Sequence, residues 1–339
     1  MKRRLAHWGP ALYSWRKPPN KKPMTICVAA IGGNGIVFCA ADRMKTGGDI
    51  EFEPKRVDPP EAALPWLFGS KIFSATASIA ALTAGESALQ SEILQEVWFN
   101  IQSRIAAAPT KWIKIKDAVE MYVDCYDKIK LKRAASAVLA PLALTPETFI
   151  QNQNSMASDF ISEIKREMQS FDMPRIDTIY AGIDQEGPHI YTITNYTTER
   201  NCVIKCNDSI GFAAIGSGAR HATSQFMQVG YHRGFLTSET LFLTYLAKKR
   251  AEIAPGVGNE TNMITIGPQL GLSGYIHKDY MKEIDLIYRR HVQSEKRILA
   301  NAFDKAEKFE KRILAERSQK TQIEPANHPA PSANKPVKK

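Results

Sequence analysis

The chain has 339 residues, of which 44% are apolar, and its formal net charge is +10. This composition supplies enough apolar side chains for a sizeable core, but no stretch approaches the ~18 apolar residues that a membrane helix needs. Five cysteines at scattered positions fit a reducing compartment better than a disulfide framework, and none shows convincing metal-ligand spacing. We therefore expect a cytoplasmic protein without a metal site.

The positive charge is concentrated at the start of the chain. Residues 1–23 contain seven basic and no acidic side chains, which leaves about +3 for the remainder. Four prolines and the lack of periodicity predict a disordered leader. Its aromatic side chains would let it contact nucleic acid or anionic lipid. We favour a plain flexible tail, or upstream sequence that is not translated, so a nucleic-acid partner is not expected.

The first predicted elements form a β-hairpin. Residues 25–31 and 36–41 are apolar runs of strand length, separated by a Gly-Gly-Asn-Gly turn. Four prolines make 43–70 irregular. The pattern then predicts, in chain order, strands at 71–73 and 79–82 and helices from about 84, over 115–132 and over 146–170.

The second half of the chain returns to strands and ends in a long helix. The predicted elements are strands at 177–183, 188–193 and 210–215, helices at 217–230 and 237–253, and strands at 262–267 and 273–277. A helix is predicted over 279–317, because Val292, Leu299, Ala306 and Ile313 recur every seven residues. We expect this apolar stripe to pack on the body or on a neighbouring subunit.

The order of the elements predicts an α+β fold. Strands that come in adjacent hairpins, rather than alternating singly with helices, favour antiparallel sheets, and two such sheets with helices outside them make a four-layer αββα sandwich. The expected organisation is a leader at 1–23, one domain at 24–278, a C-terminal helix at 279–318 and a disordered tail at 319–339.

Thr25 is the first candidate for chemistry, because it opens the first strand directly after Met24. If chain growth begins at Met24 and that methionine is trimmed, Thr25 becomes the N-terminal residue. A terminal threonine carries a nucleophile, its hydroxyl, and a base, its α-amine, whose reference pKa of ~7.7–8.0 lies near cellular pH. The amine can take the hydroxyl proton directly or through one water. Taken alone, however, Thr25 is more simply an ordinary strand threonine.

Further short motifs follow this threonine in a fixed order. They are the run 24–29, the run 37–42 ending on Asp42, the pair Thr46 and Gly48, Lys71 followed fourteen residues later by Gly85, the hairpin 177–191 and the segment 214–218. Together these motifs resemble the proteasome β-type and HslV-type peptidases of the N-terminal-nucleophile hydrolase superfamily. The run 24–29 is similar to the start of a bacterial Anbu-type subunit. The resemblance covers roughly 24–278.

The resemblance implies a catalytic role for five of these residues. Thr25 would be the nucleophile, and Lys71, paired with Asp42, would be the ammonium that lowers the pKa of the terminal amine. The backbone N–H of Gly85, at a helix start, would hold the oxyanion with help from the helix dipole. Ser217 matches the serine that hydrogen-bonds near the terminal amine.

Two further positions match the substrate-binding residues of the family. They are Thr46 and Gly48, where an extended peptide would pair with the backbone as an added strand.

The chain also departs from the family pattern. Between Asp42 and Lys71 lie 28 residues, more than is usual, so Lys55 is a rival for the lysine role. Glu252 stands near a position where the family tends to have aspartate, and the nearby Pro255 cannot supply a hydroxyl. Self-cleaving members usually have glycine before the threonine, whereas the Met24 of this chain fits removal of an initiator methionine.

The resemblance implies a threonine-type endopeptidase that hydrolyses unfolded peptide segments inside a homo-oligomer, either a ring or a helical ring. It implies no metal or organic cofactor and no membrane partner, and an ATP-dependent unfoldase is a compatible partner that the sequence does not identify. Two alternatives stay open. One is a non-catalytic structural subunit that keeps its leader, and the other is a small-molecule amidase of the same superfamily.

Overall fold

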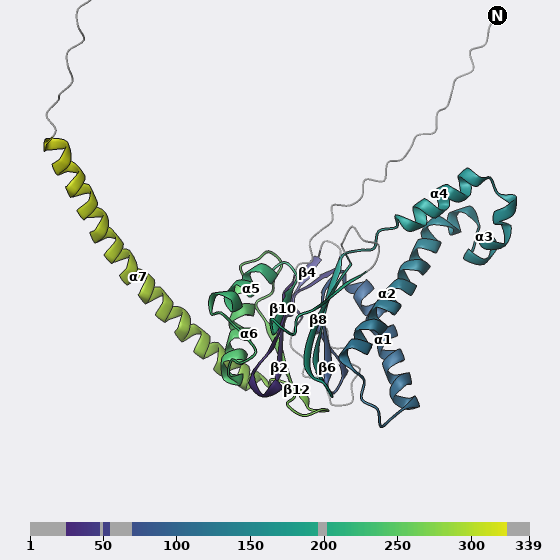
Figure 1. Cartoon of the computed structure of the whole chain (residues 1–339), viewed down its shortest axis with the longest axis horizontal. Helices are drawn as coiled ribbons and strands as arrows, with labels where there is room; N and C mark the ends of the chain where they lie inside the picture. Colours follow the sequence, from purple (N-terminus) through teal and green to yellow (C-terminus); the bar gives the residue numbers. More distant parts are fainter. Residues whose placement is uncertain (1–24, 48–49, 55–69, 196–201, 324–339) are drawn as a thin grey trace, which may run out of the picture. The chain divides into compact units, whose positions relative to one another are not determined.

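The computed structural model describes residues 25–47, 50–54, 70–195 and 202–323 (Figure 1). The chain divides into two compact units, the first ending at His277 and the second beginning at Lys278. The predicted leader at 1–23, the positions Gly48 and Lys55, and most of the predicted tail lie outside the described residues.

One antiparallel sheet of the first unit contains the start of the chain, and we call it the β1 sheet. Its strand order is β10-β1-β2-β11-β12. Its strands are β1 (Cys27–Ile31), β2 (Val37–Asp42), β10 (Phe212–Ile215), β11 (Thr261–Ile266) and β12 (Ser273–Tyr275). Every residue of β1 and β2 is buried, which explains why these strands are continuous apolar runs without alternation. The predicted hairpin is confirmed, and its turn has Asn34 and Gly35 at positive φ.

A second antiparallel sheet, the β7 sheet, has the order β5-β6-β7-β8-β9. Its strands are β5 (Ile72–Thr76), β6 (Ile79–Gly85), β7 (Ile176–Asp184), β8 (Gly187–Thr194) and β9 (Val203–Cys206). Successive residues of β7 point to opposite faces, so Tyr180 joins one apolar cluster and Ile179 the other. The sequence did not predict β9.

A two-stranded ribbon lies in the segment that was predicted to be irregular. It pairs β3 (Lys45–Gly47) with β4 (Ile50–Phe52). Strands of three residues are too short to show a period of two, which is why the sequence pattern did not indicate them.

Helices pack on both sheets (Figure 1). The described helices of the first unit are α1 (Ser87–Ala107), α2 (Ile115–Val138), α3 (Pro146–Asn152), α4 (Ser158–Gln169), α5 (Ala219–Gln228) and α6 (Thr237–Ala251), with single 3₁₀ turns at Gly33–Gly35, Ala140–Leu142 and Gln153–Ser155. Of these, α4 packs on α2. One apolar cluster joins α1 and α2 to the β7 sheet. A second lies between the two sheets. Helix α6 contacts β1 and β2. The molecule is therefore α+β with two antiparallel sheets.

Two predicted helices differ from the observed ones. The helix predicted over 146–170 is divided by the turn Gln153–Ser155, where the Ser155 hydroxyl donates to the Asn152 carbonyl, 2.8 Å away, and so competes with the helical hydrogen bonds. The helix predicted from about 84 begins at Ser87, because β6 remains paired with β7 as far as Gly85.

The second unit contains α7 (Lys278–Ile323), a helix of 46 residues that is longer than the predicted 279–317. Among the described helices, none has a stretch long and apolar enough to cross a membrane.

Candidate functional site

The two sheets bring three predicted site residues together. Thr25 lies two residues before β1, and Asp42 ends β2 opposite Ile26, whose carbonyl accepts the Asp42 N–H at 3.1 Å. Lys71 directly precedes β5 of the other sheet, and its carbonyl accepts the Thr83 N–H of β6 at 3.1 Å. Residues 46 positions apart in sequence thus meet at one end of the inter-sheet cluster.

These three side chains form a buried polar cluster, which we call the Thr25 cluster. The Thr25 hydroxyl donates to Asp42 Oδ1, and the Lys71 ammonium donates to Thr25 Oγ1. Lys71 Nζ also lies 2.8 Å from Asp42 Oδ1. The Asp42 side chain is fully buried, whereas that of Lys71 retains 11% of its exposure. The Lys71 ammonium therefore neutralises the buried Asp42 carboxylate and contacts the hydroxyl of Thr25.

Backbone groups hold the Asp42 carboxylate in place. Its Oδ1 accepts the Ile26 N–H at 3.0 Å, and its Oδ2 accepts the Gly258 N–H at 2.9 Å. Donors from two different segments thus fix both oxygens of the carboxylate. The orientation of the Asp42 carboxylate relative to Lys71 and Thr25 is therefore fixed.

Ser217 lies at the nitrogen of Thr25, as the sequence predicted. The Thr25 nitrogen donates to Ser217 Oγ at 3.3 Å. The serine hydroxyl in turn lies 3.1 Å from the carbonyl of Pro255. Pro255 therefore contacts Ser217 through its backbone carbonyl. In the chain as given, this nitrogen is an amide, because Met24 precedes it.

The approach to Thr25 requires a glycine. Gly216 has a φ of +95°, and a Cβ at this position would lie 2.3 Å from the Thr25 carbonyl oxygen. The Gly218 N–H donates to the same oxygen at 3.3 Å. The glycines on either side of Ser217 thus let the end of β10 reach the nucleophile candidate closely.

Gly85 lies at the end of β6, two residues beyond the Thr83 that bonds to Lys71. Its φ is +128°, and a Cβ there would lie 2.3 Å from the Arg175 carbonyl oxygen, so no other residue fits. The helix dipole of α1 was expected to help stabilise an oxyanion at Gly85, but a carboxylate at the helix start offsets this effect. Glu86 caps α1, and its carboxylate accepts the N–H groups of Ala88 and Leu89, which places a negative charge at the helix start.

Two of the remaining predicted residues, Thr46 and Glu252, have other described partners. Thr46 lies in β3 and pairs with Glu51. Glu252 Oε1 lies 2.6 Å from the ammonium nitrogens of both Lys248 and Lys249. Gly48 and Lys55 lie outside the described residues, and Lys71 is the lysine that contacts Thr25 and Asp42 in the part that is described.

Sequence reasoning missed Lys248 and Gly258. Thr240, Thr244 and Lys248 recur every four residues and are all fully buried on one face of α6. That spacing was a readable signal for a buried lysine. Gly258 contacts Asp42 through its backbone N–H, and a backbone contact cannot be predicted from the type of residue.

Cys27 lies close to the cluster but is a poor rival nucleophile. Its thiol is fully buried and donates to the Thr83 carbonyl at 3.4 Å. Burial raises the pKa of this thiol strongly, and the nearby Lys71 only partly opposes that effect. The thiolate, which is the reactive form, is therefore disfavoured.

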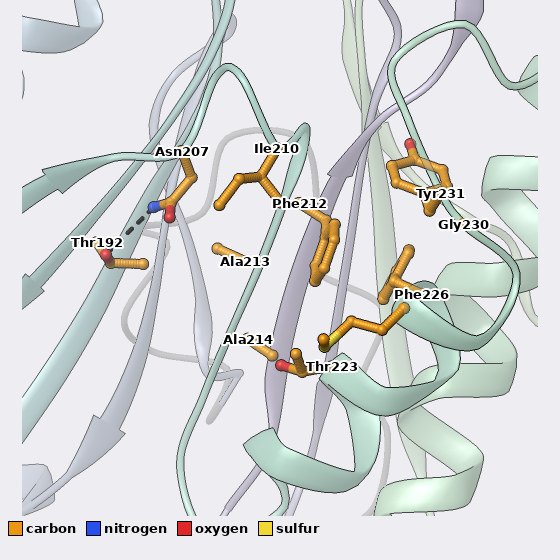
Figure 2. A pocket seen from close by; sticks show the side chains of 11 residues that line it. Thr192, Asn207, Ile210, Phe212, Ala213, Ala214, Thr223, Phe226, Gly230 and Tyr231 are labelled. Carbon is orange, nitrogen blue, oxygen red and sulfur yellow. Dashed lines mark hydrogen bonds between the residues drawn. The ribbon is translucent and has the colours of Figure 1, made fainter.

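A separate apolar pocket lies beside β10 and α5 (Figure 2). Its volume is about 480 Å³, and its wall includes Phe212 and Phe226, which stack with ring centroids 4.4 Å apart. Asn207 donates to Thr192 Oγ1 at 3.2 Å on the polar side. None of the predicted site residues lines this pocket.

Within the described residues, no three His, Cys, Asp or Glu side chains gather where they could hold a metal ion. A scan of the sequence against protein-family models finds no match, and no curated protein matches it significantly. The function is therefore inferred from the site.

Proposed function

We propose that this chain is a threonine-type endopeptidase, similar to the proteasome β-type peptidases, with Thr25 as its nucleophile. The observation that carries the proposal is the contact of Thr25 Oγ1 with both Lys71 Nζ and Asp42 Oδ1 at a buried site. An isolated strand threonine has no need of a paired ammonium and carboxylate at its hydroxyl, because burying charges costs free energy. The position of Ser217 at the Thr25 nitrogen supports the same proposal.

The proposed reaction begins once the bond before Thr25 has been cleaved. The freed α-amine takes the hydroxyl proton while Oγ1 attacks the carbonyl carbon of the substrate. Lys71 holds its positive charge beside the hydroxyl, which favours the neutral amine and the developing alkoxide. The proton then passes to the leaving amine as the peptide bond breaks. Water hydrolyses the resulting ester and restores the hydroxyl of Thr25.

The oxyanion of this reaction would be held by the backbone N–H of Gly85. Losing one such donor typically costs ~3 kcal/mol of barrier. An extended peptide would pair beside Thr46 and Gly48 as an added strand. No step of this chemistry requires a metal or organic cofactor.

The proposed fold is a four-layer αββα sandwich. The apolar clusters on the two faces of the β7 sheet and the contacts of α6 with β1 and β2 support it. By the same resemblance, we propose a cytoplasmic homo-oligomer, a ring or helical ring, that encloses its active sites. Unfolded peptides would be its substrates, and an ATP-dependent unfoldase would be its partner.

The test combines N-terminal sequencing with fluorogenic peptide cleavage. Purified protein should begin at Thr25, and Thr25→Ala should lower cleavage by at least about 1,000-fold. Thr25→Ser is the matched control, because it keeps a hydroxyl and the same terminal amine, and it should retain activity. Cleavage that is unchanged in Thr25→Ala would remove this residue from the mechanism.

The second candidate function is a non-catalytic structural subunit. It is favoured by one observation, the 24 residues that precede Thr25 in the chain. An internal Thr25 has no α-amine and therefore lacks the adjacent base. Intact mass that retains the leader, together with absent cleavage, would support this candidate. Thr25-dependent cleavage of small amides but not of peptides would instead indicate an amidase.

A further inference from the structure

Lys248 is the most deeply buried ammonium near the Thr25 cluster. It lies on α6 and has no solvent-exposed surface. Its Nζ donates to Glu252 Oε1 at 2.6 Å and to the carbonyl oxygens of Gly258 and Asn259, each at 3.0 Å. An ammonium has three N–H groups, so these three acceptors satisfy it completely.

A buried lysine of this kind is costly and rarely incidental. Taking an ammonium out of water is compensated only when its partners and geometry are good. Two of the partners of Lys248 are consecutive backbone carbonyls, which have no charge to neutralise. The contacts therefore hold a segment of chain in place as well as balancing a charge.

That segment leads directly to Asp42. The carbonyl of Gly258 accepts a hydrogen bond from Lys248, and the N–H of Gly258 donates to Asp42 Oδ2 at 2.9 Å. On another side, the Glu53 carboxylate accepts the Glu260 N–H at 2.8 Å. The segment 258–260 is thus fixed by one cation and one anion from different parts of the fold.

We propose that Lys248 is a positioning residue, which holds Gly258 so that its N–H keeps the Asp42 carboxylate turned toward Lys71 and Thr25. The inference rests on the proposed function of the Thr25 cluster. Lys248 touches neither Thr25 nor Lys71 in the described contacts, so it acts through Gly258 and Asp42.

The chain supplies a matched control in the next residue. Lys249 also lies 2.6 Å from Glu252 Oε1, and its Nζ lies 3.4 Å from the Asn259 carbonyl. No described hydrogen bond joins Lys249 to Gly258. Replacing either lysine removes one positive charge from Glu252, but only Lys248→Met removes the contact with Gly258.

The kinetic test compares Lys248→Met and Lys249→Met with the wild type, using the freed N-terminus and a fluorogenic peptide. We expect Lys248→Met to lower kcat by about 10- to 100-fold with little change in KM, because the misplacement affects the reacting groups and not the peptide-binding edge. Lys249→Met should stay within about twofold of the wild type. Equal effects of the two substitutions, or an unchanged kcat in Lys248→Met, would overturn the proposal.

A second readout does not depend on peptidase activity. The amide proton shift of Gly258 in an NMR spectrum reports its hydrogen bond to Asp42, and it should change in Lys248→Met but not in Lys249→Met. If Lys248→Met fails to fold, Lys248→Gln, which keeps two N–H donors, takes its place with a smaller expected change. A wild type without Thr25-dependent cleavage would refute the proposed function alone. An unchanged Gly258 shift would refute the role of Lys248.

Discussion

Gly216 sets how closely β10 can approach Thr25. We predict that Gly216→Ala is more destabilising than Gly230→Ala, although both glycines have positive φ, +95° and +62°. A Cβ at Gly230 meets nothing within 4 Å, so that substitution carries only the backbone cost of about 1 kcal/mol. A Cβ at Gly216 would also lie 2.3 Å from the Thr25 carbonyl oxygen and must displace it.

Urea unfolding of the two variants measures this difference. Gly216→Ala should lose at least about 2 kcal/mol more free energy of unfolding than Gly230→Ala. It should also lose peptide cleavage out of proportion to its stability at the assay temperature. Equal free energies of unfolding for the two variants would show that the approach of β10 to Thr25 is not tight.

At this scale, the sequence motifs named several side chains of the candidate site, but not Lys248. Thr25, Asp42, Lys71 and Ser217 are far apart in sequence, and the structure brings them together. Their arrangement came from the family resemblance, because spacing alone cannot say which strand ends meet. The donors on Asp42 that come from backbone atoms had no residue-type signature. Glu252, expected only near a supporting position, contacts Lys248.

Helix α6 carries a titratable group on its buried face. Burial lowers the pKa of Lys248 from its ordinary 10.5 to about 8; Glu252 and Asp42 oppose this effect, and Lys249 adds to it. Between these two values the unfolded chain keeps the proton that the folded chain has lost. The free energy of unfolding should therefore rise with pH across this window. The contribution of this group is fully present above pH 10.5 and is lost as the pH falls through about 8.

The measurement is the free energy of unfolding of the wild type minus that of Lys248→Met, followed from pH 7 to 10.5. The difference should grow in favour of the wild type by up to about 3 kcal/mol. Subtraction removes the tyrosines and cysteines that titrate in the same range in both proteins. A difference that stays flat over this window would mean that Lys248 keeps an ordinary pKa.

Helices and apolar strands were predictable, whereas some short polar strands were not. The 3.6-residue pattern located α1, α2 and α6, and apolar runs located β1, β2 and β7. Strand β9 was missed because its four residues are mostly exposed and include Lys205, so neither alternation nor an apolar run marks it. Strand pairing across the chain, such as β2 with β11, depends on tertiary packing that a local pattern does not contain.

The first unit contains the core of the molecule. The cluster between the sheets and the cluster under α1 and α2 are both formed by residues that precede His277. Hairpins in the sequence were enough to predict antiparallel sheets, because two strands joined by a short turn can pair only in that way. The strand count of the β7 sheet was not predicted, since its edge strand β9 had no signal in the sequence.

Truncation after His277 tests whether this unit folds without α7. The helix is supported internally by i,i+4 ion pairs, which include Asp285 with Arg289, Asp304 with Lys308 and Glu307 with Lys311. Both apolar clusters lie in the first unit. Removal of α7 should therefore leave a single cooperative unfolding transition, with Tm within about 5 °C of that of the full chain. Circular dichroism during heating measures both quantities. A truncated protein that melts without cooperativity would mean that α7 completes the core, and the division at His277 would then describe contacts but not folding.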